Sequence, residues 1–151
     1  MTRDPSTDIP RTPALLAMGP VLLLPLLGIA ALFLPTATAG IPVTIGQMWA
    51  AVLLLFLAGV RRGLSFFTEG GPRAVQIATA IGLFVLGVAG LLLPLRAALV
   101  ALIVGYAAIG ILDPRAARRG EVPAWFAGLR PRQMAVALAG LILLLVRVAM
   151  G

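Results

Sequence analysis

Five long apolar runs constrain the fold of this chain more than any other feature of its sequence. They lie at residues 14–35, 41–60, 74–94, 97–112 and 133–151, and Arg147 is the one charged residue within them. A hydrocarbon core about 30 Å thick takes roughly 20 helical residues to cross. Four of the runs are about that long, so they predict membrane-spanning segments.

The composition indicates that lipid surrounds most of the chain. Hydrophobic residues make up 61% of it and charged residues only 11%, whereas a soluble domain has about 25% charged residues. So few charged side chains cannot cover an apolar core of this size in water. We therefore take the bilayer as the solvent for the five runs.

The fold class follows from what lipid permits. A spanning backbone must satisfy its hydrogen bonds within a helix or a closed barrel, and barrel strands alternate apolar and polar residues. The runs show no such alternation. We predict an all-α membrane protein, in which residues 14–151 form a single bundle of five transmembrane helices and residues 1–13 form a cytoplasmic tail.

The fourth run is the weakest of the predicted spans. Its 16 residues extend only about 24 Å as a helix, so a bundle of four spans is the alternative. We expect Asp113 and Pro114 to end this helix, and the polar residues 113–133 to form a structured loop at the membrane surface. Pro20 and Pro25 are expected to kink the first helix.

The arginines predict the orientation of the bundle. The chain has twelve of them and no lysine, and a cytoplasmic N-terminus puts ten on the cytoplasmic side. These ten are Arg3, Arg11, Arg61, Arg62, Arg73, Arg115, Arg118, Arg119, Arg130 and Arg132; Arg96 lies on the opposite side and Arg147 near the outer end of the fifth span. Cytoplasmic loops carry an excess of basic residues. We therefore predict that the N-terminus is cytoplasmic and that the C-terminus is outside.

A cleaved signal peptide is an alternative interpretation of the first run. Arg11 precedes the run, and Ala37 and Ala39 offer a cleavage site. The apolar stretch is longer than the 7 to 15 residues usual for a signal core, however. We favour an uncleaved first helix, and the rest of the topology does not depend on the choice.

The chemistry available to the chain is narrow. It has no Cys and no His, which excludes disulfides, thiolate or imidazole metal sites and Cys or His catalysis. The acidic residues are Asp4, Asp8, Glu69, Asp113 and Glu121, and none falls within a predicted span. We therefore predict no catalytic, cofactor-binding or metal site.

The net charge of +7 suits attraction to anionic lipid headgroups on the cytoplasmic side, and we expect no nucleic acid. A larger membrane complex or a second copy of the chain is a further expected partner.

The residues predicted to fix topology and contact headgroups are Arg61, Arg62, Arg115, Arg118, Arg119 and Arg130. Those predicted to anchor at the interface are Trp49, Trp125 and Phe126. Those predicted to pack helices closely are Gly59, Gly63, Gly82 and Gly105.

Four further polar side chains lie in the predicted spans. Arg147 is expected to extend to the outer headgroups. Gln47, Gln76 and Tyr106 are expected to pack or to form hydrogen bonds between helices, rather than to bind a ligand.

Two segments resemble the domain of unknown function 3429 family. The first carries Trp49, Phe56, Leu57, Gly59, Arg61 and Gly63, and the second Asp113, Gly120, Pro123, Trp125, Phe126 and Arg130. The first departs from the family pattern at Leu55, in place of a serine, and at Arg62, in place of a tryptophan. The resemblance implies a small multi-span protein of bacterial inner membranes, related to a mitochondrial inner-membrane protein. It implies no activity.

Three functions remain open at this level. The favoured one is a non-catalytic accessory, assembly or scaffold component of a membrane complex, because the spans are almost free of polar groups. A small transporter or channel is the alternative, and it would need a polar route across the bundle. A membrane enzyme acting on lipid headgroups is less favoured, because single carboxylates on separate loops do not form an acid–base pair.

Overall fold

The computed structural model describes residues 11–151, and within that range it contains five helices and no strand. They are α1 (Arg11–Phe33), α2 (Thr36–Ser65), α3 (Ala74–Leu92), α4 (Leu95–Arg118) and α5 (Phe126–Met150). All five are long and apolar enough to cross a membrane, so the predicted all-α class with five spans is confirmed. Of the predicted tail, residues 1–10 lie outside the described residues, and α1 already begins at Arg11.

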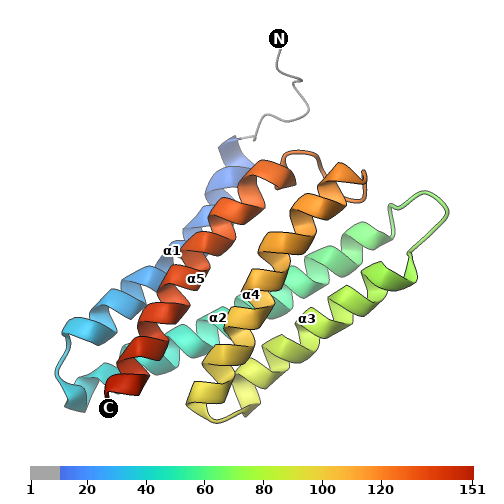
Figure 1. The fold of residues 1–151 in the computed structure, drawn as a ribbon. Coiled ribbons are helices and arrows are strands. Elements are labelled where there is room, and N and C mark those ends of the chain that lie inside the picture. The colour runs from blue at the N-terminus through green and yellow to red at the C-terminus, as the bar shows by residue number, and fades with distance from the viewer. Residues whose placement is uncertain (1–10) are drawn as a thin grey trace.

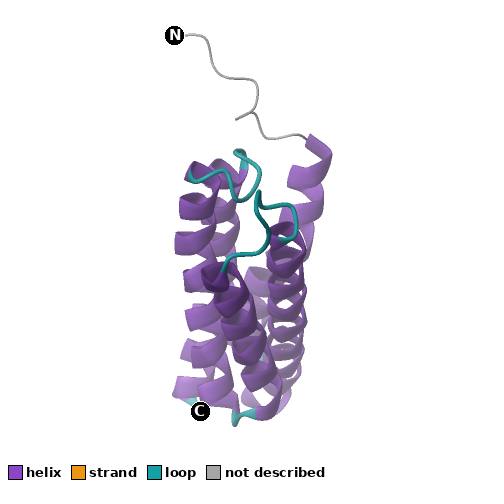
Figure 2. Ribbon diagram, turned by 90° about the vertical axis from the view of Figure 1, so that its right-hand side faces the viewer, coloured by secondary structure: helices purple, strands orange, loops and turns teal. Residues whose placement is uncertain are grey.

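The helices run up and down in one bundle (Figure 1). α2 contacts each of the other four helices, and α1 lies against α5 as well as α2. Figure 2 shows that the two longer loops, residues 66–73 and 119–125, lie at the end where α1 begins, opposite the C-terminus. We call this the basic end, because most of the arginines lie there.

The prediction that α4 ends at Asp113 and Pro114 is wrong. The helix is 24 residues long and continues to Arg118, with both residues buried inside it. Pro114 removes the hydrogen bond to the carbonyl of Gly110, but the next turn still forms. The full helix extends about 36 Å, so the alternative of four spans is not needed.

α5 begins earlier than predicted, because the expected surface loop is partly helical. Phe126 to Arg130 form the first turn and a half of α5, and Pro131 follows within the helix. Pro131 is beyond the first turn, so it removes the hydrogen bond to the carbonyl of Ala127, yet the helix continues through it. The remaining loop turns at Gly120, whose φ of 69° suits glycine.

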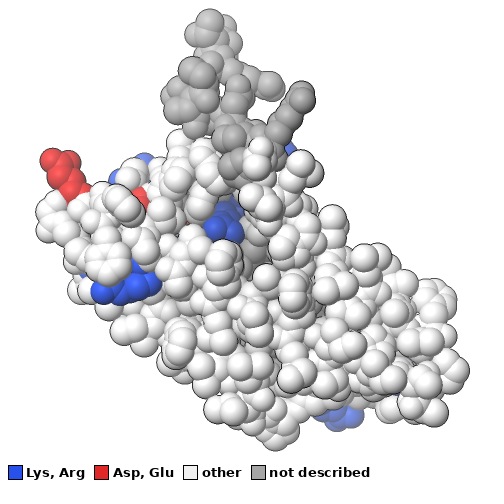
Figure 3. Space-filling view, turned by 180° about the vertical axis from the view of Figure 1, so that it is seen from behind, with Lys and Arg blue, Asp and Glu red and all other residues white. Residues whose placement is uncertain are grey.

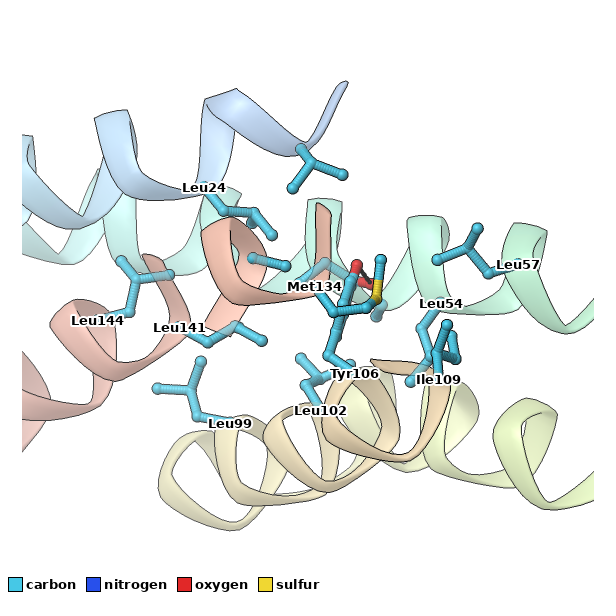
Figure 4. Close-up of a cluster of buried hydrophobic side chains, with 14 of the residues drawn as sticks. Leu24, Leu54, Leu57, Leu99, Leu102, Tyr106, Ile109, Met134, Leu141 and Leu144 are labelled. Carbon is cyan, nitrogen blue, oxygen red and sulfur yellow. Dashed lines mark hydrogen bonds between the residues drawn. The ribbon is translucent and has the colours of Figure 1, made fainter. Parts of the chain in front are cut away.

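Apolar side chains fill the middle of the bundle. Figure 4 shows Tyr106 and Leu102 from α4 facing Leu54 of α2 and Met134 of α5. These four side chains are buried to 1% exposure or less. The Tyr106 hydroxyl donates a hydrogen bond of 2.9 Å to the carbonyl of Ala50, as expected for a helix-to-helix contact. The buried charged side chains of the described residues lie nearer the two ends of the bundle; they are Arg61, Asp113, Arg130 and Arg147.

The outer surface of the bundle is also apolar. Phe33 is 85% exposed and Leu92 78% exposed, as are many other large apolar residues that a soluble monomer would bury. Figure 3 shows that the charged side chains visible on the rear face gather toward its two ends and leave an uncharged surface between them. Such a belt is suited to contact with lipid tails.

Candidate functional site

A buried ion cluster occupies the basic end of the bundle. Arg61 near the end of α2, Asp113 in α4 and Arg130 in α5 meet there, and each is between 6% and 8% exposed. Nη1 of Arg61 donates to Oδ1 of Asp113. Nε of Arg130 lies 3.1 Å from the other carboxylate oxygen, but it is not aligned for a hydrogen bond. We call these three residues the ion triad.

Hydrogen bonds extend the ion triad to the other two helices. Nε of Arg61 donates to Oγ1 of Thr79 on α3 at 3.0 Å. Nη1 of Arg130 donates to Oε1 of Gln133 at 2.7 Å, and Nε2 of Gln133 donates to the carbonyl of Ala17 on α1 at 2.7 Å. One connected set of polar contacts therefore joins all five helices at this end.

The ion triad carries more positive than negative charge. Two guanidinium groups share the single carboxylate of Asp113, so its formal charge is +1. Burial of ions is costly unless each is paired. Arg130 gains a further contact from Phe126, whose ring centroid lies 4.4 Å from the guanidinium carbon, a favourable cation–π arrangement.

A second set of ion pairs lies nearer the surface of the same end. The carboxylate of Glu121 is 2.9 Å from Arg119 and 3.3 Å from Arg73. Its side chain is 7% exposed, while those of the two arginines are more than half exposed. These pairs tie the loop after α4 to the start of α3. Asp113 and Glu121 are thus paired with different arginines.

The opposite end holds fewer polar contacts. Arg147 does not extend to the headgroups as expected, because it is 8% exposed and its Nε donates to the carbonyl of Ala31 at 2.9 Å. That bond joins α5 to α1. Gln47 donates to the carbonyl of Gly90 at 2.9 Å, which is the contact between helices expected for it. Arg96 donates to the carbonyl of Val148.

The residues predicted to contact headgroups divide into two groups. Arg115, Arg118 and Arg119 are exposed and Arg62 is half-buried, so their contact with headgroups stays a prediction. Arg61 and Arg130 lie inside the bundle and bind Asp113, a role that the sequence analysis missed. A signal was present: all three members of the ion triad belong to the two segments that carry the family resemblance.

The predicted aromatic anchors are only partly exposed. The indole of Trp49 donates to the carbonyl of Pro20 at 2.8 Å and so joins α2 to α1. Phe126 is buried and meets Trp125 edge to face, with ring centroids 4.5 Å apart. Their anchoring at the interface stays a prediction.

The predicted packing glycines behave differently from one another. A Cβ at Gly105 would lie 2.5 Å from Cδ2 of Leu54, so this glycine does allow close packing. A Cβ at Gly59, Gly63 or Gly82 would meet nothing within 4 Å. The expected packing within the chain is therefore not found at those three. Sequence reasoning missed Gly140, where a Cβ would lie 2.5 Å from the backbone nitrogen of Pro25.

Both segments of family resemblance thus lie in one connected bundle, with the residues of the ion triad in contact. A family model described as "Protein of unknown function (DUF3429)" matches residues 11–146. The chain belongs to the DUF3429 family. No curated protein and no solved structure matches it. Membership in DUF3429 adds no activity, so any function must be argued from the bundle itself. Across residues 11–151 no three His, Cys, Asp or Glu side chains group as metal ligands would.

Proposed function

We propose that this protein is a non-catalytic accessory, assembly or scaffold component of a larger membrane complex. The observation that carries the proposal is that the middle of the bundle is filled by buried, mostly apolar side chains. Tyr106, Leu102 and Leu141 are fully buried there, and the buried charged side chains of the described chain lie at the two ends. A bundle without a polar path through its middle is suited to holding neighbours and lipids in place.

The proposed location is the bacterial inner membrane, with the basic end in the cytoplasm. The distribution of arginines supports this orientation, since cytoplasmic segments are enriched in basic residues. The exposed arginines Arg115, Arg118 and Arg119 are then at the level of the headgroups. Anionic lipids are the expected contacts of these side chains.

Crosslinking in native membranes tests the proposed function. A tagged copy is crosslinked, extracted in mild detergent, and separated by size before mass spectrometry. A tagged multi-pass protein of similar size and abundance is the control. We expect this chain to elute well above its monomer mass, with a defined set of proteins in constant proportion. Elution as a lone monomer, with the same bulk proteins as the control, would contradict the proposal.

A small transporter is the second candidate, and the ion triad is the observation that favours it. Ionisable side chains inside membrane segments commonly mark substrate or proton pathways. A transport pathway would have to open the apolar layer around Tyr106 to water from each side in turn. Solvent access to that layer therefore separates the two candidates, and the scaffold proposal expects none.

A further inference from the structure

An apolar groove of about 200 Å³ opens between α1, α2 and α5 near the basic end. Leu16 and Pro20 form one wall and Leu53 and Phe56 the other. Leu16 is 72% exposed and Phe56 64% exposed, so the outer edge of the groove lies on the apolar surface of the bundle. Its shape and chemistry suit a hydrocarbon chain.

Arg130 and Gln133 line the same groove. Nη1 of Arg130 donates to Gln133, whereas the buried Nε lies 3.1 Å from Asp113 without forming a hydrogen bond. The side chain of Arg130 is 7% exposed.

The net charge beside the groove favours a negatively charged ligand. The ion triad has a formal charge of +1 in a site that is largely removed from water. An anion beside Arg130 would balance that charge and accept a charge-assisted hydrogen bond from the guanidinium. The amide of Gln133 is a further polar neighbour of the same site.

We propose that this groove binds one anionic membrane phospholipid. The phosphate contacts Arg130 and Gln133, and an acyl chain lies along Leu16, Pro20, Leu53 and Phe56. Arg130 lies in the second turn of α5, near the end of the bundle, where the phosphate of a membrane lipid is expected. The proposal stands independently of whether the chain belongs to a larger complex.

A larger groove of about 360 Å³ lies between α2 and α3 and reaches Arg62. The guanidinium of Arg62 lies 4.0 Å from the ring centroid of Phe66 and donates to Ser65, and its side chain is not part of the ion triad. Among the described residues that line this larger groove, Arg62 is the only charged one. We therefore assign the selective site to the groove that contains Arg130.

Native mass spectrometry of the full chain tests the site. The protein is purified in mild detergent and offered equal amounts of phosphatidylglycerol and phosphatidylcholine of the same chain length. We expect one tightly held lipid, with a preference of about fivefold for the anionic one, the effect of a single basic side chain near a membrane surface. Equal retention of the two lipids by the wild type would overturn the proposal.

Two tryptophan variants locate the lipid. Leu53→Trp fills the groove, whereas Val52→Trp adds the same side chain one residue away, at a position that is 52% exposed and does not line the groove. We expect the first to lose the preference for the anionic lipid and the second to keep it. Equal preference in the two variants would show that the lipid binds elsewhere and would overturn the assignment.

Arg130→Gln tests the role of the guanidinium. We expect the variant to retain phosphatidylglycerol and phosphatidylcholine equally. Because Arg130 also belongs to the ion triad, the melting temperature is measured alongside. If this variant does not fold, the wild-type preference and the tryptophan pair decide the proposal. A folded Arg130→Gln protein that keeps the full preference would overturn it.

Discussion

At the scale of single residues, Asp113 carries the most consequential charge in the bundle. Its carboxylate lies between two buried guanidiniums on neighbouring helices. Asp113→Asn would leave both of them without a counter-ion. Breaking a buried ion pair by removing one partner is destabilising by about 3–5 kcal/mol, and we expect a loss of that order in the free energy of unfolding in detergent micelles.

Glu69→Gln is the matched control for Asp113→Asn. Glu69 is exposed in the loop after α2, so removal of its charge is expected to change the free energy of unfolding by less than about 0.5 kcal/mol. If the two variants unfold alike, the ion triad does not hold the helices together.

Removal of the Tyr106 hydroxyl is expected to lower the free energy of unfolding by less than Asp113→Asn does. Tyr106→Phe keeps the packed ring and removes only the hydrogen bond to the carbonyl of Ala50. Hydrogen bonds between membrane helices contribute about 0.6 kcal/mol on average, and we expect a loss of about 1 kcal/mol in the free energy of unfolding. Tyr106→Ala opens a cavity and should be destabilising by several times as much, about 3–5 kcal/mol. Equal losses in the two variants would contradict this division.

At the scale of the helices, α1 and α5 approach each other closely at two glycines, Gly28 and Gly140. A Cβ at Gly140 would overlap the backbone of Leu24 and Pro25, and backbone atoms yield less easily than a flexible side chain. Gly140→Ala is expected to lower the free energy of unfolding by about 1–3 kcal/mol, the usual range for overpacking. The loss should appear in thermal unfolding of the purified protein.

Gly59→Ala provides the comparison on α2. Nothing lies within 4 Å of a Cβ at that position, and alanine favours a helix interior over glycine by about 0.5–1 kcal/mol. We expect this variant to be as stable as the wild type or slightly more so. A loss comparable to that of Gly140→Ala would mean that Gly59 is packed against another chain.

The ends of the helices could not be predicted from local sequence alone. The apolar runs predicted the helices because each run must satisfy its backbone internally in lipid. α4 continues past Asp113, whose carboxylate is paired with Arg61, 52 residues away in sequence. A polar residue after an apolar run indicates a helix end only when it has no partner inside the protein.

At the scale of the whole molecule, polar contacts at the basic end join all five helices, while apolar packing holds the middle. The number of helices and the general arrangement followed from the apolar runs. The ion triad did not, because its members come from three helices and only the folded chain brings them together. The glycines at true helix contacts, such as Gly140, were likewise indistinguishable in sequence from those that face outward, such as Gly82.

The central claim is that five spanning helices close around a middle that water does not enter. The chain has no native cysteine, so single cysteines report on it cleanly. Ala50 and Ala137 are fully buried in the middle, and Glu69 is exposed at the basic end.

The deciding measurement is labelling of these three cysteine variants by a membrane-impermeant thiol reagent, in vesicles of each orientation. We expect Glu69→Cys to react from the cytoplasmic face alone, and Ala50→Cys and Ala137→Cys to stay unlabelled from both faces. Labelling of the two buried positions in the folded protein would contradict the account, because it would reveal a water-filled path through the bundle.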